Sequence, residues 1–536
     1  DSNAETSQQV NTAAGRSMIA TFSDRALSMT TPRFFQSAAI YTDRRAISLF
    51  FLGFAAGLPF LLIFSSLSIW LNEAGVDRGT VTRFSWAALA YSCKFIWSPL
   101  VDTLPLPLLT RRLGRRRAWL AQCVVIAAIC LMALINPADS EALSLMALAA
   151  VLLGFSAATQ DIVIDAYRIE AAAGDSAMQA AMAATYTAGY RCGMIVSGAG
   201  ALLLATWFGS TMQHYDYAAW RATYFCMAAV MGIGLTTTLI LREPPTSGGV
   251  NTLRPVADNL RLLALFAVAV VVLIAVYRLL SGLPAASSVL GGFLRESLRL
   301  IGGLAAAALV GTVCVHAGLV SRELAWQTWL EPVADFFRRY GRVALLLLAL
   351  IGTYRISDTV MGIMANPFYV DMAYTKDEVA AVSKTWGLVM TLLGAFVGGG
   401  LALRFGVMRI LMLGALLSSL SNLLFAWLAG YGHSVAALAA VVSADNLASG
   451  LASAAFVGYL SSLTSLGYSA TQYALFSSLM LLGPKLLAGF SGHYVNAFGY
   501  ANFFTATALL GLPVLALVWL AQRAESSRKQ EQIQAG

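Results

Sequence analysis

The sequence has little charge and lacks the residue spacings that mark most enzyme and metal sites. Only 12% of its 536 residues are charged, and its six cysteines and four histidines are scattered, with no CxxC or CxxH spacing. We therefore expect the cysteines to be buried apolar residues rather than a metal or redox site. No GxSxG, HExxH, Walker A or dinucleotide-binding motif occurs in a loop that could reach water. The sequence thus predicts no enzymatic activity, no metal site and no cofactor.

Long apolar runs make up most of the chain. Hydrophobic residues account for 58% of the sequence, which is typical of a polytopic α-helical membrane protein. In a soluble protein the net charge of +8 would suggest an acidic partner, but here the positions of the cations matter more. They gather beside the first, second and last predicted spans: Arg25, Arg33, Arg44, Arg45, Arg111, Arg112, Arg115 to Arg117, Arg523, Arg528 and Lys529. By the positive-inside rule, we predict that both termini are cytoplasmic. Because topology accounts for these cations, we predict no nucleic-acid partner.

The apolar runs predict about fourteen transmembrane helices, arranged as two sets of six with an inserted pair. The first set covers 46–70, 81–100, 119–135, 143–167, 178–207 and 217–241, the pair 262–280 and 298–319, and the second set 343–364, 379–403, 407–429, 435–463, 472–488 and 503–520. Residues 321–342 are expected to form an amphipathic helix on the membrane surface. The predicted divisions are a cytoplasmic segment 1–45, a six-helix half 46–242, a linker with the extra helices 243–342, a second six-helix half 343–522 and a cytoplasmic tail 523–536.

The two sets of six resemble each other at three corresponding positions. The matched segments are GVDRGTVTRFSW and AYTKDEVAAVSKTW after the first spans, Arg191 and Lys485 in the fifth spans, and SAATQD and SADN in the fourth spans. Repeats of this kind are typical of transporters that bind their substrate near the midplane, between the halves. The predicted fold class is therefore an all-α bundle with 6+6 pseudo-symmetry.

The fourth predicted span carries charges that lipid cannot accept. At about 100° per residue, Asp161, Asp165 and Arg168 share one face of this helix. A charge at the bilayer centre costs about 2.5 to 3.5 kcal/mol, so this face must line a polar interior. We predict that Asp161 takes up and releases a proton as the interior alternates between wet and closed. The alternative is a permanent ion pair of Asp161 with Lys94 or Arg191.

Other charges lie nearer the cytoplasmic ends of the spans. Asp165 and Arg168 are spaced i,i+3, which favours a structural or gating bridge over proton transfer. Asp102 and Arg115 to Arg117 frame the basic loop after the second span. We expect them to form a latch at an inner gate, in a loop that also sets the topology.

The second half contains its own polar residues. Arg355 and Asp358 are spaced i,i+3 in its first span, so Arg355 is a candidate gating residue and Asp358 a second candidate for proton coupling. The two could also simply neutralise each other. Asp445 and Asn446 lie in a segment of small residues, where close helix packing competes with lining the substrate path.

Cations at matched positions of the two halves indicate an anionic substrate. Arg191 and Lys485 would face a shared cavity if the repeat holds, and Lys94 lies at similar depth. A desolvated carboxylate needs fixed positive partners of this kind. The alternative is that they only balance the buried carboxylates. Gln160, beside Asp161, is a further candidate for substrate binding.

Several segments together resemble the AmpG muropeptide permease family of Gram-negative bacteria. They are LGFAAGLPFLL (52–62), KFIWSPLVD (94–102), GRRRAWL (114–120), SAATQDIVIDAYR (156–168), GYRCGMIVSGAGAL (189–202), SKTWGLVMTLLGAFVGGGL (383–401) and SADNLASGLASAAFVGYLSSLTSLGYSATQYALFSSL (443–479). The likeness covers both halves and fails across about 252–342, so the inserted helices stay unexplained.

The resemblance implies a major facilitator fold in the bacterial inner membrane. It also implies proton-driven import of N-acetylglucosaminyl-1,6-anhydro-N-acetylmuramyl peptides for cell-wall recycling, which is linked to β-lactamase induction. Such ligands carry carboxylates for Arg191, Lys94 or Lys485 and sugar hydroxyls for Gln160 and Asn446. We expect a monomer in the lipid bilayer, energised by the proton motive force. The alternatives are a transporter of another bulky anion, such as an acetyl-CoA-like or peptide solute, or a membrane sensor that does not transport.

Overall fold

The computed structural model describes residues 40–536 except for 77–90, 92, 105–108, 119–120, 140, 212, 245–254, 283–288, 489–490 and 536. The chain divides into two compact units, Asp1–Asp43 and Arg44–Gly536. In the first unit, the described part contains one short helix, η1 (Ile40–Thr42). The second unit consists of helices and, among its described residues, contains no strand beyond an isolated bridge between Thr211 and His214. The predicted all-α membrane fold is confirmed.

The first half of the second unit contains the helices that precede the predicted linker. They are α3 (Arg44–Leu61), η2 (Leu62–Ser66), α4 (Leu67–Glu73), η4 (Lys94–Ile96), α7 (Ser98–Thr103), α8 (Leu109–Leu113), α9 (Arg115–Ala118), α10 (Ala121–Ala133), α11 (Leu143–Ala171), α12 (Ser176–Ile195), η5 (Val196–Gly200), α13 (Ala201–Trp207) and α14 (Tyr217–Ile240). Single π turns, η2 and η5, join α3 to α4 and α12 to α13, so each pair forms one long span.

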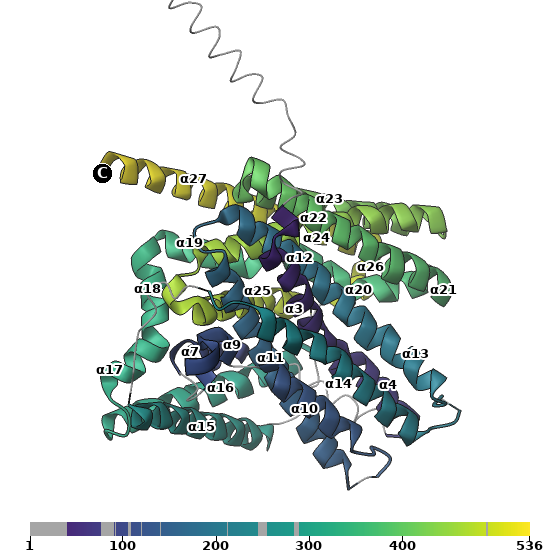
Figure 1. Cartoon of the computed structure of the whole chain (residues 1–536). Coiled ribbons are helices and arrows are strands. Elements are labelled where there is room, and N and C mark those ends of the chain that lie inside the picture. Colours follow the sequence, from purple (N-terminus) through teal and green to yellow (C-terminus); the bar gives the residue numbers. More distant parts are fainter. Residues whose placement is uncertain are drawn as a thin grey trace, which may run out of the picture. The chain divides into compact units, whose positions relative to one another are not determined.

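An inserted group of helices follows α14. It consists of α15 (Val256–Leu279), η6 (Leu280–Gly282), α16 (Val289–His316), α17 (Arg322–Ala325), η7 (Trp326–Leu330) and α18 (Glu331–Tyr340). In Figure 1, α15 and α16 lie side by side, and α17 and α18 run along one side of the bundle, from α16 towards the start of the second half.

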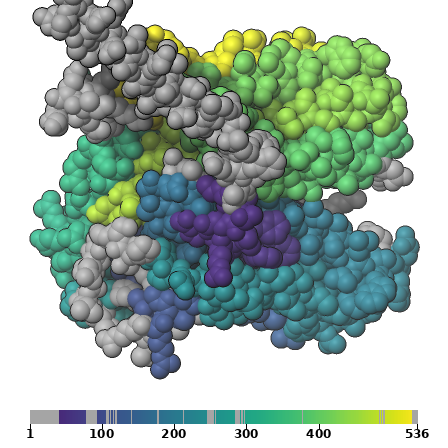
Figure 2. Space-filling view, turned by 45° about the horizontal axis from the view of Figure 1, so that its top comes forward, coloured from purple at the N-terminus to yellow at the C-terminus, as the bar shows by residue number. Residues whose placement is uncertain are grey.

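The second half contains the helices that follow the inserted group. Its helices are α19 (Val343–Thr353), α20 (Ile356–Asp371), α21 (Lys376–Val379), η8 (Ala380–Trp386), α22 (Gly387–Phe405), α23 (Val407–Tyr431), α24 (Val435–Leu463), η9 (Leu466–Tyr468), α25 (Ser469–Ala488), α26 (Ser491–Leu509) and α27 (Gly511–Ala535). Figure 2 shows this half in green to yellow, beside the blue and teal residues of the first half.

Eleven helical runs among the described residues are long and apolar enough to cross a membrane, and α10 is a shorter apolar helix. The predicted count of about fourteen is therefore not confirmed. Most of the second predicted span lies outside the described residues. The helix α25 is not among the eleven, and it carries the polar residues Thr471, Gln472 and Lys485. The predicted domain boundaries stay predictions.

Glycines bring helix backbones into direct contact in both halves. A Cβ atom on Gly53 or Gly57 of α3 would lie 2.2 or 2.1 Å from the carbonyl oxygens of Tyr186 and Tyr190 on α12. In the second half, a Cβ atom on Gly450 of α24 would lie 2.1 Å from the carbonyl oxygen of Thr391 on α22. Lipid provides no hydrophobic driving force for helix association. Small residues let the two backbones approach closely, so van der Waals packing can hold the helices together.

Replacing Gly57 with Val should destabilise the protein, because the new Cβ cannot fit beside Tyr190 unless the backbone of α3 or α12 moves. Overpacking of this kind costs about 1–3 kcal/mol or more. Thermal unfolding in detergent measures the effect. The matched control is Gly232→Val on α14, where no described residue of another element lies within 4 Å of the added Cβ. Equal melting temperatures for the two variants would show that α3 and α12 are not in close contact.

Candidate functional site

A chain of buried charges crosses the middle of the first half. The ammonium Nζ of Lys94 lies 3.3 Å from Oδ2 of Asp161 and 3.7 Å from Oδ2 of Asp165. Lys94 lies on η4, and both carboxylates lie on α11, one helical turn apart. The Tyr186 hydroxyl on α12 donates a hydrogen bond of 2.8 Å to Oδ1 of Asp161. Lys94 is thus the cation that the two carboxylates share.

Arg168 extends this chain to the second half. Its Nη2 lies 3.2 Å from Oδ1 of Asp165, and its Nη1 donates a hydrogen bond of 2.7 Å to Oγ of Ser461 on α24. The guanidinium also lies over the ring of Tyr473 on α25, 5.0 Å from its centroid. The two carboxylates and two cations, Asp161, Lys94, Asp165 and Arg168, neutralise one another. The ion pair with Lys94 that the sequence left as an alternative is present.

Gln160, the neighbour of Asp161, is fully buried. Neither its Oε1 nor its Nε2 has a hydrogen-bond partner among the described residues, and the buried Tyr91 hydroxyl also lacks one. In this arrangement Gln160 has no surface that a solute could touch. The predicted contact of Gln160 with substrate stays a prediction.

The second half holds a separate polar cluster. Arg355 lies between α19 and α20, donates a hydrogen bond to Ser453, and has its Nη2 3.3 Å from Oδ2 of Asp358. Asp358 also accepts a hydrogen bond from Ser418, and the nearby Asp445 accepts one of 2.9 Å from Ser421. Arg355 and Asp358 thus neutralise each other, as their spacing allowed.

Asn446 is held by its own half. Its Oδ1 accepts a hydrogen bond of 2.8 Å from the Thr391 hydroxyl on α22, and its Nδ2 donates one of 2.9 Å to the Val442 carbonyl oxygen. This is the packing role that the sequence left open for this residue. Lys485 lies on α25, but its side chain is outside the described residues.

Arg191 on α12 is half-buried and differs from the cations described above. No hydrogen bond or ion pair joins its guanidinium to another residue in the part of the chain that the structure describes. The positive charge of Arg355, from the opposite half, acts on it. The two guanidinium groups, one from each half, therefore act on each other, and among the described residues only that of Arg355 has a countercharge.

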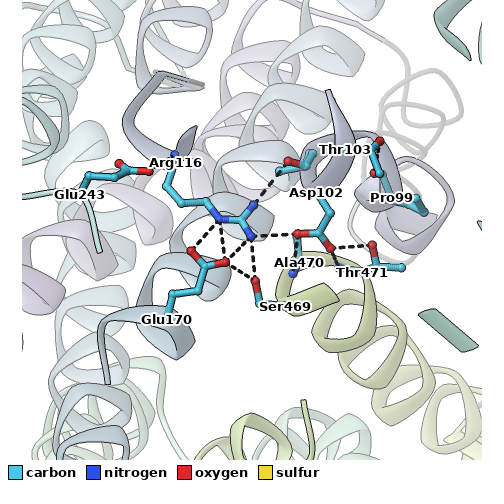
Figure 3. Close-up of polar contacts among 10 residues, drawn as sticks. Pro99, Asp102, Thr103, Arg116, Glu170, Glu243, Ser469, Ala470 and Thr471 are labelled. Atoms are coloured by element: carbon cyan, nitrogen blue, oxygen red, sulfur yellow. Dashed lines mark hydrogen bonds and ion pairs between the residues drawn. The ribbon is translucent and has the colours of Figure 1, made fainter. Parts of the chain in front are cut away.

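A second set of ion pairs lies where the first half meets the start of α25 (Figure 3). Arg116 on α9 lies 2.8 Å from Oδ1 of Asp102 on α7 and 2.5 Å from Oε1 of Glu170 on α11. Ser469, at the start of α25, accepts a hydrogen bond of 2.7 Å from Arg116 and donates one of 2.6 Å to Glu170. We call the region formed by Asp102, Arg116, Glu170 and the start of α25 the arginine-rich end.

Asp102 also binds the first turn of α25 directly. Its carboxylate accepts hydrogen bonds from the backbone N–H groups of Ala470 (3.2 Å) and Thr471 (2.8 Å) and from the Thr471 hydroxyl (2.7 Å). An anion is favourable there, because the first N–H groups of a helix lack partners and carry partial positive charge. Burial alone would lower the pKa of Arg116, but the charges of Asp102 and Glu170 outweigh burial and raise it above its ordinary value.

Comparison with known sequences decides the family. The sequence model of the Major Facilitator Superfamily matches residues 46–370, more than half of the chain. The chain belongs to the Major Facilitator Superfamily. It is 32% identical to the transporter named AmpG 4 of Rickettsia conorii, covering 89% of this chain and 97% of that protein. It is 29% identical to the anhydromuropeptide permease of Escherichia coli K12, covering 90% and 81%. The predicted AmpG resemblance is confirmed.

Solved structures agree with this assignment. The facilitator FucP, in an outward conformation, superimposes with a TM-score of 0.55 at 13% identity, covering 89% of this chain and 97% of FucP. The proton:xylose symporter XylE superimposes with a TM-score of 0.51 at 12% identity, covering 90% and 94%. At such identities the likeness concerns the fold. As a member of the Major Facilitator Superfamily, this chain is a multi-pass membrane transporter and not an enzyme, as predicted.

In this facilitator, the hydrogen bonds that join the two halves lie at or just inside the arginine-rich end. Among the described residues they connect Arg116, Asp102 and Glu170 to the first turn of α25, and Arg168 to Ser461. The arginine-rich end is therefore closed in this conformation.

Sequence reasoning missed the uncharged partners of these charges. Tyr186, Ser461, Ser469, Thr471 and Tyr473 hold Asp161, Arg168, Glu170 and Asp102 in place. Charge at bilayer depth marks a candidate residue in a sequence, and Ser, Thr and Tyr carry no such charge. No signal in a single sequence distinguishes these hydroxyl groups from the many others in the spans.

Proposed function

We propose that this transporter imports anhydromuropeptides from the periplasm to the cytoplasm across the bacterial inner membrane by proton symport. Arg191 is the observation that carries the proposal. It is a cation in a membrane-spanning helix with no countercharge among the described residues. A charge in that environment is costly unless a ligand neutralises it. The E. coli relative is named for this class of substrate, whose peptide carries carboxylates.

Recognition would use both halves. A carboxylate between Arg191 and Arg355 would neutralise Arg191 and bridge the two halves at once, since guanidinium groups bind carboxylates through two parallel hydrogen bonds. Lys485, on the matched helix of the second half, is a third candidate cation. Asp445 and Asn446, on α24 of the second half, would bind sugar hydroxyls after a change of rotamer.

Proton coupling would act through Asp161. The carboxylate is neutralised by Lys94 and lies about one helical turn from Asp165. Protonation of Asp161 would leave Lys94 to Asp165 alone and would weaken the link from Asp165 through Arg168 to Ser461 of the other half. Asp358 is the second coupling candidate. The energy source is the proton motive force, and no cofactor is needed.

The arginine-rich end would be the cytoplasmic gate. The positive-inside rule assigns the loop with Arg111 to Arg117 to the cytoplasm. Asp102 and Arg116 would hold this gate shut, with Asp165 and Arg168 as a second bridge just inside it, while the substrate enters from the periplasm. Both termini are then cytoplasmic, and the transporter works as a monomer. Import of these fragments would supply cell-wall recycling and, through it, β-lactamase induction.

Uptake of labelled anhydromuropeptide into vesicles tests this function directly. We expect uptake that a proton ionophore abolishes, and Asp161→Asn should reduce ionophore-sensitive uptake at least about tenfold, as expected for loss of a residue that carries the coupled proton. No uptake above empty vesicles would refute the substrate. Uptake that the ionophore leaves unchanged would refute only the proton coupling.

Arg191→Gln should raise the substrate concentration needed for half-maximal uptake about tenfold or more, because a charge-assisted hydrogen bond contributes about 1.5–3 kcal/mol. The matched control is Arg221→Gln, which removes an exposed arginine from α14 that contacts only Tyr217 among the described rings. Equal uptake curves for the two variants would exclude Arg191 from the substrate site.

A further inference from the structure

The inserted helices touch both halves at the arginine-rich end. We call α17, η7 and α18, residues 322–340, the surface segment. Trp329 of this segment donates a hydrogen bond of 3.4 Å to the carbonyl oxygen of Ile96 in the first half. Arg339 donates one of 3.1 Å to the carbonyl oxygen of Leu463, the last residue of α24 in the second half. In Figure 1 the segment runs along one side of the bundle, next to α25.

Gln472 joins the surface segment to the gate. Its buried amide Nε2 donates hydrogen bonds of 2.8 Å to the Pro332 carbonyl oxygen and 2.9 Å to Oδ2 of Asp335, and its Oε1 accepts one of 2.8 Å from Arg339. Gln472 directly follows Thr471, which binds Asp102. The first turn of α25 is therefore held by the first half and by the surface segment together.

One face of the surface segment is packed against the protein. Leu324, Thr328, Pro332 and Phe336 recur every four residues and are all buried. The Phe336 ring lies 5.1 Å from that of Phe476 on α25. Leu324 belongs to a buried cluster that also contains residues of α7 and α25: Leu100, Val101, Ala470 and Ala474.

The opposite face is apolar and exposed. Trp326, Leu330, Val333 and Phe337 are 47%, 52%, 36% and 39% exposed, and their spacing of four, three and four residues places them in one stripe. The membrane-spanning helix α19 begins at Val343, three residues after α18 ends. The stripe therefore lies where the chain enters the bilayer, which is the position of an interfacial helix.

Arginines at both ends of the segment indicate which lipid it meets. Arg322 and Arg342 are exposed, and the described residues include no ion-pair partner for either. Arg338, also exposed, is paired with Glu331. Unpaired arginines beside an apolar stripe at a membrane boundary attract anionic headgroups.

We propose that the surface segment binds the anionic bilayer surface and thereby stabilises the closed arginine-rich end. The bilayer surface would bind the exposed stripe and so fix the position of the segment. The segment is hydrogen-bonded to Gln472, which lies in the turn of α25 that Asp102 binds. Loss of anionic lipid would loosen that turn. This inference concerns the closed end itself and does not depend on which solute is transported.

The experiment measures how readily the closed end opens in two kinds of vesicle. Ala474→Cys, buried beneath the surface segment, is introduced into full-length protein whose six native cysteines are replaced by Ala. The protein is reconstituted in phosphatidylcholine alone or with about 30% phosphatidylglycerol, and maleimide labelling is timed. We expect labelling to be roughly threefold to tenfold slower with the anionic lipid.

Two variants and a control decide the cause. Arg322→Gln with Arg342→Gln should make labelling equally fast in both vesicles, and Gln472→Met should speed it in both. The control pair Arg404→Gln and Arg409→Gln removes two exposed arginines outside the segment and should keep the lipid dependence. Equal labelling of the parent protein in the two vesicles, or a lipid dependence that survives loss of Arg322 and Arg342, would overturn the proposal.

Lipid contact is measured separately, so the proposal stays testable if Gln472→Met does not fold. The fluorescence of Trp326 is measured as the difference between the parent protein and Trp326→Phe. Brominated phosphatidylglycerol should quench this fluorescence more than brominated phosphatidylcholine does. Equal quenching by the two lipids would contradict the anionic preference. Vesicles that fail to take up muropeptide yet show lipid-dependent labelling would refute only the proposed substrate.

Discussion

Arg116→Ala should open the arginine-rich end and abolish transport. The substitution leaves the carboxylates of Asp102 and Glu170 buried without the cation that they share. Removing one partner of a buried ion pair costs about 3–5 kcal/mol, so the closed state should lose at least a hundredfold in population. Hydrogen exchange measures this directly: the amides of Ala470 and Thr471, which donate to Asp102, should exchange roughly a hundredfold faster.

Arg117→Ala is the matched control for this prediction. Arg117 is the next residue, but its guanidinium donates to the carbonyl oxygens of Thr238 and Leu239 at the end of α14, within its own half. Its loss should leave the exchange of Ala470 and Thr471 unchanged. If Arg116→Ala also left that exchange unchanged, the contacts of Figure 3 would not be what stabilises the closed end.

Asp102 explains why this end of the bundle can reopen. Most of its contacts with α25 are hydrogen bonds to backbone N–H groups and one hydroxyl, which water can replace when the halves separate. Asp102 and Glu170 would both keep Arg116 in an open state, since all three belong to the first half. Opening therefore exposes an ion pair to water but does not break one, which keeps the two states close in free energy.

Local rules predicted the helices and which charged residues lie on one helix face or near each other in the chain. The spacing of Asp161, Asp165 and Arg168 placed them on one face of α11. This inference needs only the geometry of a single helix. The latch between Asp102 and the arginines of the next loop is also local, because only 14 residues separate Asp102 from Arg116.

Contacts between the two halves could not be predicted. Glu170 and Ser469 are 299 residues apart, and only the packing of the two halves brings them together. Likewise, the sequence allows either Arg191 or Lys94 as the partner of Asp161, but Lys94 takes that place, and the described residues include no countercharge for Arg191. Which of two cations at similar depth reaches a carboxylate depends on helix rotation, and a hydropathy pattern does not determine that rotation to within one residue.

Lys94→Met should be the most damaging single change in the membrane interior. Asp161 and Asp165 would then face each other without their common cation, leaving one uncompensated buried negative charge beside the Asp165 and Arg168 pair. We expect a loss of about 3–5 kcal/mol in stability and at least a hundredfold loss of uptake. Thermal unfolding and vesicle uptake measure the two effects.

The double variant Lys94→Met with Asp161→Asn separates charge balance from proton coupling. It removes one cation and one anion, so the pair of Asp165 and Arg168 stays neutral and the melting temperature should return close to that of the parent protein. Uptake should stay lost, because Asp161 is the residue proposed to carry the proton. If uptake also returned and still responded to the ionophore, Asp161 would serve only to balance Lys94, and the coupling role would pass to Asp358. A melting temperature that stayed low would instead mean that the contacts of the Lys94 side chain, rather than its charge, hold η4 against α11.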